Sequence, residues 1–316
     1  IGAMPYLLKK VKLPIYSTAL TLGLIDGKLK EHGLQGKVQL NTVKPGQTVR
    51  LGCFGVEFIH VNHSISDAVG LAIHSPAGTL LHTGDFKIDC TPLKEEMIDL
   101  GRIAELGQQG VLALMADSTN VDRPGYTPTE RKISDAFEKL FLQAAEQRII
   151  IATFASNISR VQQIINSAYK YGRKVVVEGR SMVNIIATAS ELGYLDVPEN
   201  TLIEIDQMKN YPPEKMVLIT TGSQGESMAA LSRMAADVHK KITIMPGDTV
   251  IFSSNPIPGN EKSVSRVINE LSSKGANVIF QDAHVSGHAC QEELKLIYSL
   301  VKPKYAVPVH GEYRHL

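Results

Sequence analysis

The sequence predicts an α/β protein built in two parts, and three observations support this prediction. Short runs of β-branched residues alternate with longer stretches that have the apolar spacing of helices, which is typical of the α/β class. Four strand-like runs follow one another between residues 48 and 83 without intervening helices, which indicates an antiparallel or mixed sheet. From Thr129 the order becomes strand, polar loop and helix, repeated, so a domain boundary is expected near Thr129.

The individual elements follow from apolar spacing and from turn residues. Helices are predicted over residues 4–12, ended by Pro14, and over residues 18–32, before Gly33. The strands of the first part are residues 48–51, 56–61, 70–74 and 79–83. Those of the second part are residues 148–153, 174–178, 216–220, 248–252 and 277–281. A last strand over residues 305–310 follows a helix over residues 289–301.

Composition excludes several classes of protein. Hydrophobic residues make up 43% and charged residues 21% of the chain, which excludes disorder, collagen and a pure coiled coil. The formal charge is only +1, so no chain-wide basic field indicates nucleic acid, although a local basic channel is compatible with a neutral total. No apolar run reaches the roughly 18 residues that span a bilayer, and no signal-peptide pattern is seen. The three cysteines lack C-x-x-C spacing, which favours a reducing compartment, the cytoplasm.

Small polar residues directly follow several predicted strands. Gly222 and Ser223 follow one strand, Ser253 and Ser254 follow another, and Asn120 follows an apolar run before the second part. Ligands of α/β sheets sit beyond the carboxyl ends of strands, where loop N–H groups can bind an anion. The same residue types cap helices and form turns, so a phosphate-rich ligand and plain capping both remain open.

Three residues at predicted strand ends have the chemistry of metal ligands: His63, Asp85 and His310. Two imidazoles and a carboxylate suit zinc or a harder divalent ion, and an aspartate can bridge two metals. A single histidine at a strand end is more often a structural residue, and spacing alone does not assemble three ligands. The residues therefore support a metal hydrolase only as one hypothesis.

The remaining histidines are expected to be structural or exposed. Those inside predicted strands are expected to be structural: His60, His74 and His82. Those in polar stretches are expected at the surface: His32, His239 and His315.

Five longer motifs carry a family resemblance. They are residues 62–67 (Asn-His-Ser-Ile-Ser-Asp), 83–89 (Thr-Gly-Asp-Phe-Lys-Ile-Asp), 117–120 (Asp-Ser-Thr-Asn), 284–289 (His-Val-Ser-Gly-His-Ala) and 308–312 (Pro-Val-His-Gly-Glu). The first two resemble the third and fourth metal motifs of the metallo-β-lactamase superfamily. The other three are similar to motifs of its β-CASP nucleic-acid branch. Over essentially its whole length the chain most resembles the ribonuclease J family.

The resemblance implies a fold and a division of the chain. The fold is a metallo-β-lactamase αββα sandwich with an inserted β-CASP α/β domain, a parallel sheet flanked by helices. Residues 1–129 and the returning residues 292–316 would form the metallo-β-lactamase domain, and residues 130–291 the β-CASP domain.

The resemblance also implies a metal-dependent ribonuclease of RNA maturation and decay. Such an enzyme is a 5′→3′ exonuclease on 5′-monophosphorylated RNA, with internal cleavage as a second mode. Two ions, zinc with magnesium or manganese as alternatives, would hold the hydroxide that attacks the phosphodiester. His63 would bind one ion, Asp85 would bridge both as a catalytic residue, and His310 would bind the second.

Further roles are carried over from the same resemblance. His288 would contact the scissile phosphate or assist the leaving oxygen, and Asp117 would support the metal ligands. The substrate-binding set, which includes a pocket for the RNA 5′-monophosphate, would be His284, Ser286, Gly287, His288, Ser253, Ser254, Gly222, Ser223 and Asn120. Expected partners are RNA, further copies in a homodimer or homotetramer or a paralogue in a hetero-oligomer, and other RNA-decay proteins, with no membrane.

One motif of the family is missing from the 316 residues. The sequence His-x-His-x-Asp-His, which in the family precedes a stretch like residues 1–8, does not occur. The chain is therefore expected to be a fragment that lacks metal ligands, binds metal poorly and is inactive alone. Two alternatives are a non-catalytic RNA-binding or scaffold paralogue and a metal hydrolase of small molecules.

Overall fold

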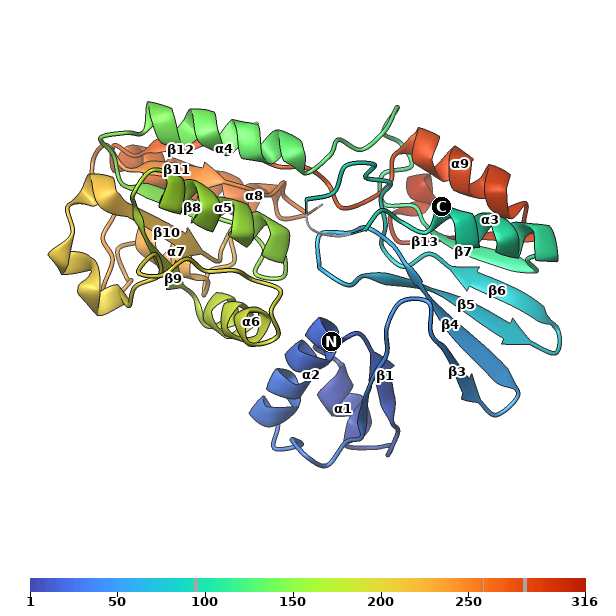
Figure 1. Cartoon of the computed structure of the whole chain (residues 1–316). Coiled ribbons are helices and arrows are strands. Elements are labelled where there is room, and N and C mark those ends of the chain that lie inside the picture. The colour runs from blue at the N-terminus through green and yellow to red at the C-terminus, as the bar shows by residue number, and fades with distance from the viewer. Residues whose placement is uncertain (94–95, 258, 281–282) are drawn as a thin grey trace. The chain divides into compact units, whose positions relative to one another are not determined.

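The computed structural model describes residues 1–93, 96–257, 259–280 and 283–316. The chain divides into two compact units, coloured in Figure 1 from blue at the N-terminus to red at the C-terminus. Unit 1 comprises Ile1–Glu130 and Ser286–Leu316, and unit 2 comprises Arg131–Val285. The chain thus leaves unit 1 after Glu130 and returns to it at Ser286. Among the described residues, none of the helices has the length and apolar character needed to cross a membrane.

Unit 1 contains a mixed six-stranded sheet, as the sequence predicts. Its strands are β3 (Thr48–Leu51), β4 (Phe54–His60), β5 (Val69–Ser75), β6 (Gly78–His82), β7 (Ala113–Asp117) and β13 (Tyr305–Val309). They lie in the order β13-β7-β6-β5-β4-β3. β3 to β6 pair antiparallel because short turns join them. β7 pairs parallel with β6, and β13 pairs parallel with β7, each after a helical connection.

Two helices, α3 (Leu100–Gln109) and α9 (Gln291–Val301), pack side by side on unit 1 (Figure 1). Alternate residues of the strands point toward them, which gives the period-two burial expected of a half-covered sheet. The shared core includes Ala72, Leu81, Leu114, Ile103, Leu106, Ile297 and Val301. This packing fixes the strands whose ends carry the candidate site.

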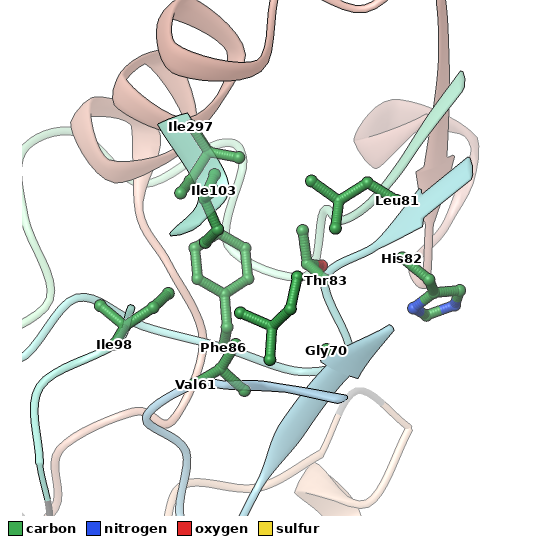
Figure 2. A pocket seen from close by; sticks show the side chains of 10 residues that line it. Val61, Gly70, Leu81, His82, Thr83, Phe86, Ile98, Ile103 and Ile297 are labelled. Atoms are coloured by element: carbon green, nitrogen blue, oxygen red, sulfur yellow. The ribbon is translucent and has the colours of Figure 1, made fainter. Parts of the chain in front are cut away.

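A small void remains in the core of unit 1. Its volume is about 10 Å³, and Figure 2 shows the side chains of Phe86, Ile98 and Ile103 gathered around it. A space of this size holds about one water-sized probe, and its lining is mainly aliphatic. We interpret it as an imperfection of core packing and not as a substrate site.

The N-terminal segment of unit 1 has a hydrophobic cluster of its own. It contains α1 (Met4–Leu8), β1 (Ile15–Ser17), α2 (Ala19–Glu31) and β2 (Leu40–Thr42). The first helix is shorter than predicted, and the parallel pair β1–β2 is missing from the sequence-based prediction. Three-residue strands contain too few residues to produce a periodic signal.

Unit 2 contains the predicted parallel sheet flanked by helices. Its strands, in the order β12-β11-β8-β10-β9, are β8 (Ile149–Ala152), β9 (Lys174–Glu178), β10 (Met216–Thr220), β11 (Thr249–Phe252) and β12 (Asn277–Ile279). The helices are α4 (Arg131–Gln143), α5 (Ile158–Lys170), α6 (Arg180–Glu191), α7 (Ala230–Ala235) and α8 (Glu261–Ser273). Short 3₁₀ helices occur at Ile205–Asn210 and Pro213–Lys215 in this unit, and at Tyr313–His315 in unit 1. The predicted strand 277–281 ends at Ile279, and its residue 281 lies outside the described residues.

Candidate metal centre

Four strands of unit 1 end at the same edge of its sheet. β4 and β6 are both antiparallel to β5, and β6, β7 and β13 are mutually parallel, so all four run in one direction. Their carboxyl ends therefore meet where ligands collect in α/β sheets. His63, Asp85 and His310 follow three of these strands, and Asp117 is the last residue of β7.

The side chains at this edge form a cluster with metal-ligand chemistry. One donor atom from each of His63, Asp85 and His288 lies within 4.8 Å of the other two. His63 Nε2 is 3.8 Å from Asp85 Oδ2, and His310 Nε2 is 2.8 Å from Asp85 Oδ1. The structure thus brings the three sequence-predicted ligands together and adds His288 to them.

The hydrogen bonds of two histidines define which ring nitrogen is free. His63 Nδ1 lies 2.9 Å from the carbonyl oxygen of Gly287, which can only accept, so Nδ1 carries the proton. His288 Nδ1 lies 2.7 Å from Asp117 Oδ2 and donates to it. In neutral His63 this leaves the Nε2 lone pair free, the arrangement in which a histidine binds metal while its other nitrogen is anchored.

The two imidazoles differ in their charge states. Burial lowers the pKa of His63, despite the opposing hydrogen bond to Gly287, so its neutral form is favoured. Burial also opposes charge on His288, but the hydrogen bond and the negative charge of Asp117 outweigh it and raise the pKa of His288. A histidine must be neutral to bind a metal ion. His63 is therefore the better ligand, and His288 the better partner for a phosphate.

Asp117 is the main electrostatic partner of His288. Burial disfavours its charge, but the hydrogen bond from His288 and two more from Thr119 lower the pKa of Asp117. Its backbone N–H donates to Thr83 Oγ1 at 3.0 Å, which ties the end of β7 to the end of β6. Asp117 is therefore held as a carboxylate directed at His288.

Gly287 allows the loop before α9 to approach His63 closely. A Cβ atom at this position would lie 2.3 Å from Ser64 Oγ and 2.6 Å from His63 Nδ1, closer than real Cβ contacts. Only glycine therefore lets the carbonyl of residue 287 accept the hydrogen bond from His63. Its contribution is to fix the orientation of an imidazole.

Glu293 is a site-organising residue that the sequence analysis missed. Its buried carboxylate accepts hydrogen bonds from the backbone N–H groups of Ile88 at 2.7 Å, Thr127 at 2.7 Å and Cys290 at 2.8 Å. Ile88 belongs to the loop of Asp85, and Cys290 follows His288 by two residues. One signal was available, because Glu293 is the third residue of α9, where a glutamate often caps a helix.

Two predicted substrate-binding residues lie beside the cluster in unit 1. Asn120 Nδ2 donates to Ser286 Oγ at 2.8 Å and to the carbonyl oxygen of His288 at 3.1 Å. Ser286 Oγ also accepts from the N–H of His288 at 3.2 Å. These bonds shape the loop that presents His288.

The remaining predicted binding residues belong to unit 2. Ser253 and Ser254 are buried, and their hydroxyls bond to other protein groups: Ser253 Oγ to Ala283 and Arg160, Ser254 Oγ to Gln224. Gly222 and Ser223 follow β10, and half-buried His284 lies just before the return to unit 1. The two serine hydroxyls thus take part in the internal bonding of unit 2.

The other histidines include two corrections. His60, His74 and His82 hydrogen-bond to Glu96, Glu57 and Gly84 as structural residues, as predicted. The predictions that His239 and His315 lie at the surface are wrong, because their side chains are only 4% and 7% exposed. Each accompanies a carboxylate, Glu178 and Asp122 respectively, that its local sequence does not reveal.

Comparisons with known proteins give consistent matches. The family model "Ribonuclease J, beta-CASP domain" matches residues 146–271, and "Zn-dependent metallo-hydrolase RNA specificity domain" matches residues 277–316. Ribonuclease J of Helicobacter pylori strain J99 is 49% identical over 320 residues, which cover 100% of this chain and 46% of that protein. Ribonuclease J of Synechocystis is 48% identical, over 100% of this chain and 50% of that protein.

A solved structure shows the same fold. A protein of unknown function from Enterococcus faecalis V583 aligns with a TM-score of 0.68 and 16% identity, over 96% of this chain and 72% of that one. Fold and matches together define the β-CASP class of metallo-hydrolase-like proteins. The chain belongs to the ribonuclease J family. It spans about half the length of the curated relatives it matches.

Proposed function

We propose that the chain is the core of a metal-dependent ribonuclease that hydrolyses phosphodiester bonds of RNA. The observation that carries this proposal is the cluster of His63, Asp85 and His288 at one sheet edge, in a chain of the ribonuclease J family. The names of the curated relatives, and the zinc-dependent metallo-hydrolase family model, support the same reaction class.

The residues present fit a divalent metal. The donor set of imidazole and carboxylate suits zinc, with manganese or magnesium as alternatives. We assign His63, Asp85 and His310 to holding metal, with Asp85 placed to serve two ions because its two oxygens face different histidines. When bound, such ions would stabilise charge on a phosphate and activate water for attack.

His288 has a separate role in this proposal. Because Asp117 favours its imidazolium form, His288 is suited to contact the scissile phosphate or to give a proton to the leaving oxygen. Asp117 holds the ring through Nδ1, so Nε2–H would face the substrate.

Unit 2 is proposed to recognise the RNA. The finer activity is 5′→3′ exonucleolysis of 5′-monophosphorylated RNA, with internal cleavage as a second mode. Polar loops with Gly222, Ser223 and Asn255 follow its parallel strands, where backbone N–H groups can receive an anion. In this proposal residues 1–129 and 292–316 form the metallo-β-lactamase domain and residues 130–291 the β-CASP domain.

Location and partners belong to the same proposal. Three free cysteines, Cys53, Cys90 and Cys290, are compatible with a reducing cytoplasm. RNA is the proposed main partner, and assembly with further copies or with a paralogue is proposed beside it.

The test is cleavage of 5′-monophosphorylated RNA by the full-length protein with Asp85→Asn. Loss of a charge that serves the metals should lower the rate on the order of 10³-fold, since metal ions supply several kcal/mol of charge stabilisation. Asp135→Asn, an exposed aspartate of α4, is the matched control and should cleave as the unmodified protein does.

Metal analysis of the same proteins completes the test. Bound metal should fall in Asp85→Asn and stay unchanged in Asp135→Asn. An unchanged cleavage rate in Asp85→Asn would contradict the assignment. The 316-residue chain alone should bind metal weakly, since the motif His-x-His-x-Asp-His does not occur in it.

A further inference from the structure

The formal charges of the chain are distributed unevenly. Residues 1–47 contain seven lysines against two acidic residues, Asp26 and Glu31, which gives +5. The other 269 residues contain 26 basic and 30 acidic residues, which gives −4. The near-neutral total therefore hides a strongly basic N-terminal segment. A concentration of one sign of charge costs self-repulsion and attracts the opposite charge.

Most of these lysines have no carboxylate partner. Lys28 pairs with Glu31, but Lys9, Lys10, Lys12 and Lys30 make no ion pair with any residue that the structure describes. All of them are exposed. Their charges are available to an external anion.

Two lysines flank a surface groove in this segment. Lys12 and Lys37 line a groove of about 230 Å³ together with aliphatic residues that include Leu8 and Val38. Lys37 Nζ donates to the carbonyl oxygen of Gly33 at 2.9 Å, a neutral acceptor that does not compensate its charge. The groove thus combines apolar and cationic lining residues.

The size and chemistry of the groove fit part of an extended strand. Pockets that enclose small molecules measure about 300–1,000 Å³, so this groove is too shallow to engulf one. Lysines bind phosphates as point charges, and apolar lining residues can receive sugars and base edges. In the same N-terminal segment, the ring of Tyr6 is 62% exposed and packs edge-on against His32 at 5.2 Å, which leaves an aromatic surface for a base.

We propose that this basic groove, lined by Lys12 and Lys37 on the N-terminal segment, binds the sugar-phosphate backbone of single-stranded RNA as an accessory surface. The proposal rests on the proposed function, since it takes RNA as the substrate. None of its residues belongs to the candidate metal centre, so it adds affinity without sequence preference and leaves the chemical step unchanged.

The test measures the binding of a 3′-labelled single-stranded RNA to the chain by fluorescence anisotropy, over a series of salt concentrations. The double variant Lys12→Glu/Lys37→Glu should weaken binding about 10-fold. The slope of log K against log salt should become shallower by about 1.4, since each phosphate contact on a single strand contributes about 0.7. The variant Lys12→Arg/Lys37→Arg should keep the affinity.

The matched control is Lys132→Glu/Lys139→Glu on α4, which makes the same change in net charge at exposed lysines. If both glutamate variants weaken RNA binding equally, or if neither weakens it, the groove assignment is overturned. RNA binding by the unmodified chain would still uphold the proposed function in that case. Absence of RNA binding by the unmodified chain would overturn both. Binding of polyglutamate as tight as that of RNA would show an acidic protein partner and overturn the RNA assignment.

Discussion

The two units place polar residues at the carboxyl ends of their strands but use different residue types there. Unit 1 collects histidines and carboxylates, and the candidate metal cluster found among the described residues belongs to it. Unit 2 has mainly serine, glycine, asparagine and glutamine in the corresponding loops, and its one histidine–carboxylate pair named above, His239 with Glu178 at the end of β9, is not part of the metal cluster. The same topological rule thus yields groups that can activate a reaction in unit 1 and groups that can recognise an anion in unit 2.

The interiors behind these edges differ as well. In unit 2 the fully buried Arg160 donates to the carbonyl oxygens of Ser253 and Ala283 at 3.1 and 2.9 Å, and to Ser253 Oγ. Its charge supports loop backbones and does not reach the surface. In unit 1 the buried charges of Asp117 and Glu293 lie directly behind the cluster. In unit 1 the buried charge of Asp117 therefore tunes the side chain of His288, whereas buried Glu293 holds loop backbones, as Arg160 does in unit 2.

If unit 1 serves catalysis and unit 2 serves RNA recognition, the largest effect that separates these two roles is expected from Asp117→Asn in the full-length protein. The amide keeps the shape but removes the charge that raises the pKa of His288, and loss of a supporting partner of this kind costs about 10- to 100-fold in activity. RNA affinity should stay within about 2-fold. Single-turnover cleavage and anisotropy measure the two quantities separately, with Asp135→Asn as the control. Parallel losses of rate and affinity would break the division of roles between the units.

A smaller effect is expected from Gln224→Ala in unit 2. Gln224 bridges two loops: its Nε2 donates to the carbonyl oxygen of Asn255 at 2.9 Å, and its Oε1 accepts from the N–H of Ile257 at 2.7 Å. Alanine removes both hydrogen bonds and loosens the loops. RNA should bind about 10-fold more weakly, equivalent to about 1.4 kcal/mol. Exposed Gln143→Ala is the control. A slower chemical step at saturating RNA would place Gln224 in catalysis and contradict the comparison.

Strands and strand-end residues could be predicted from the sequence because both depend on local patterns. β3, β9 and β10 begin and end as predicted, since β-branched runs between turn residues define them. The positions of His63, Asp85 and His310 followed from the ends of such runs. The convergence of these three residues on one site did not follow from the strand pattern, and only the resemblance to a known family predicted it.

What could not be predicted depends on contacts between distant residues. The stretch around Glu293 signals only its bond to the N–H of Cys290, because the other two N–H groups, those of Ile88 and Thr127, lie more than a hundred residues away in the chain. The proton positions on His63 and His288 depend on Gly287 and Asp117, which meet them only after folding. Buried His239 looked like a surface residue because its neighbours in sequence are polar.

The smallest effect concerns the stability of each unit in acid. In unit 1 the guanidinium of Arg102 donates from Nε and Nη2 to the two carboxylate oxygens of Glu57 at 2.7 and 3.0 Å. These bonds lower the pKa of Glu57 against the opposing effect of burial. A carboxyl whose folded pKa is depressed stabilises the fold above its unfolded pKa, near 4.5, and this stability is lost as pH falls through the folded pKa.

Arg102→Met should therefore cost about 1–2 kcal/mol of unfolding free energy at pH 7, in line with hydrogen bonds to charged groups, and much less near pH 3. Urea unfolding of the chain at both pH values measures the difference. The matched variant in unit 2 is Lys170→Met, which removes an exposed pair with Glu138 and should leave the midpoint unchanged. A cost for Arg102→Met that is the same at both pH values would show that packing of the side-chain stem, and not the charge on Glu57, holds α3 to the sheet.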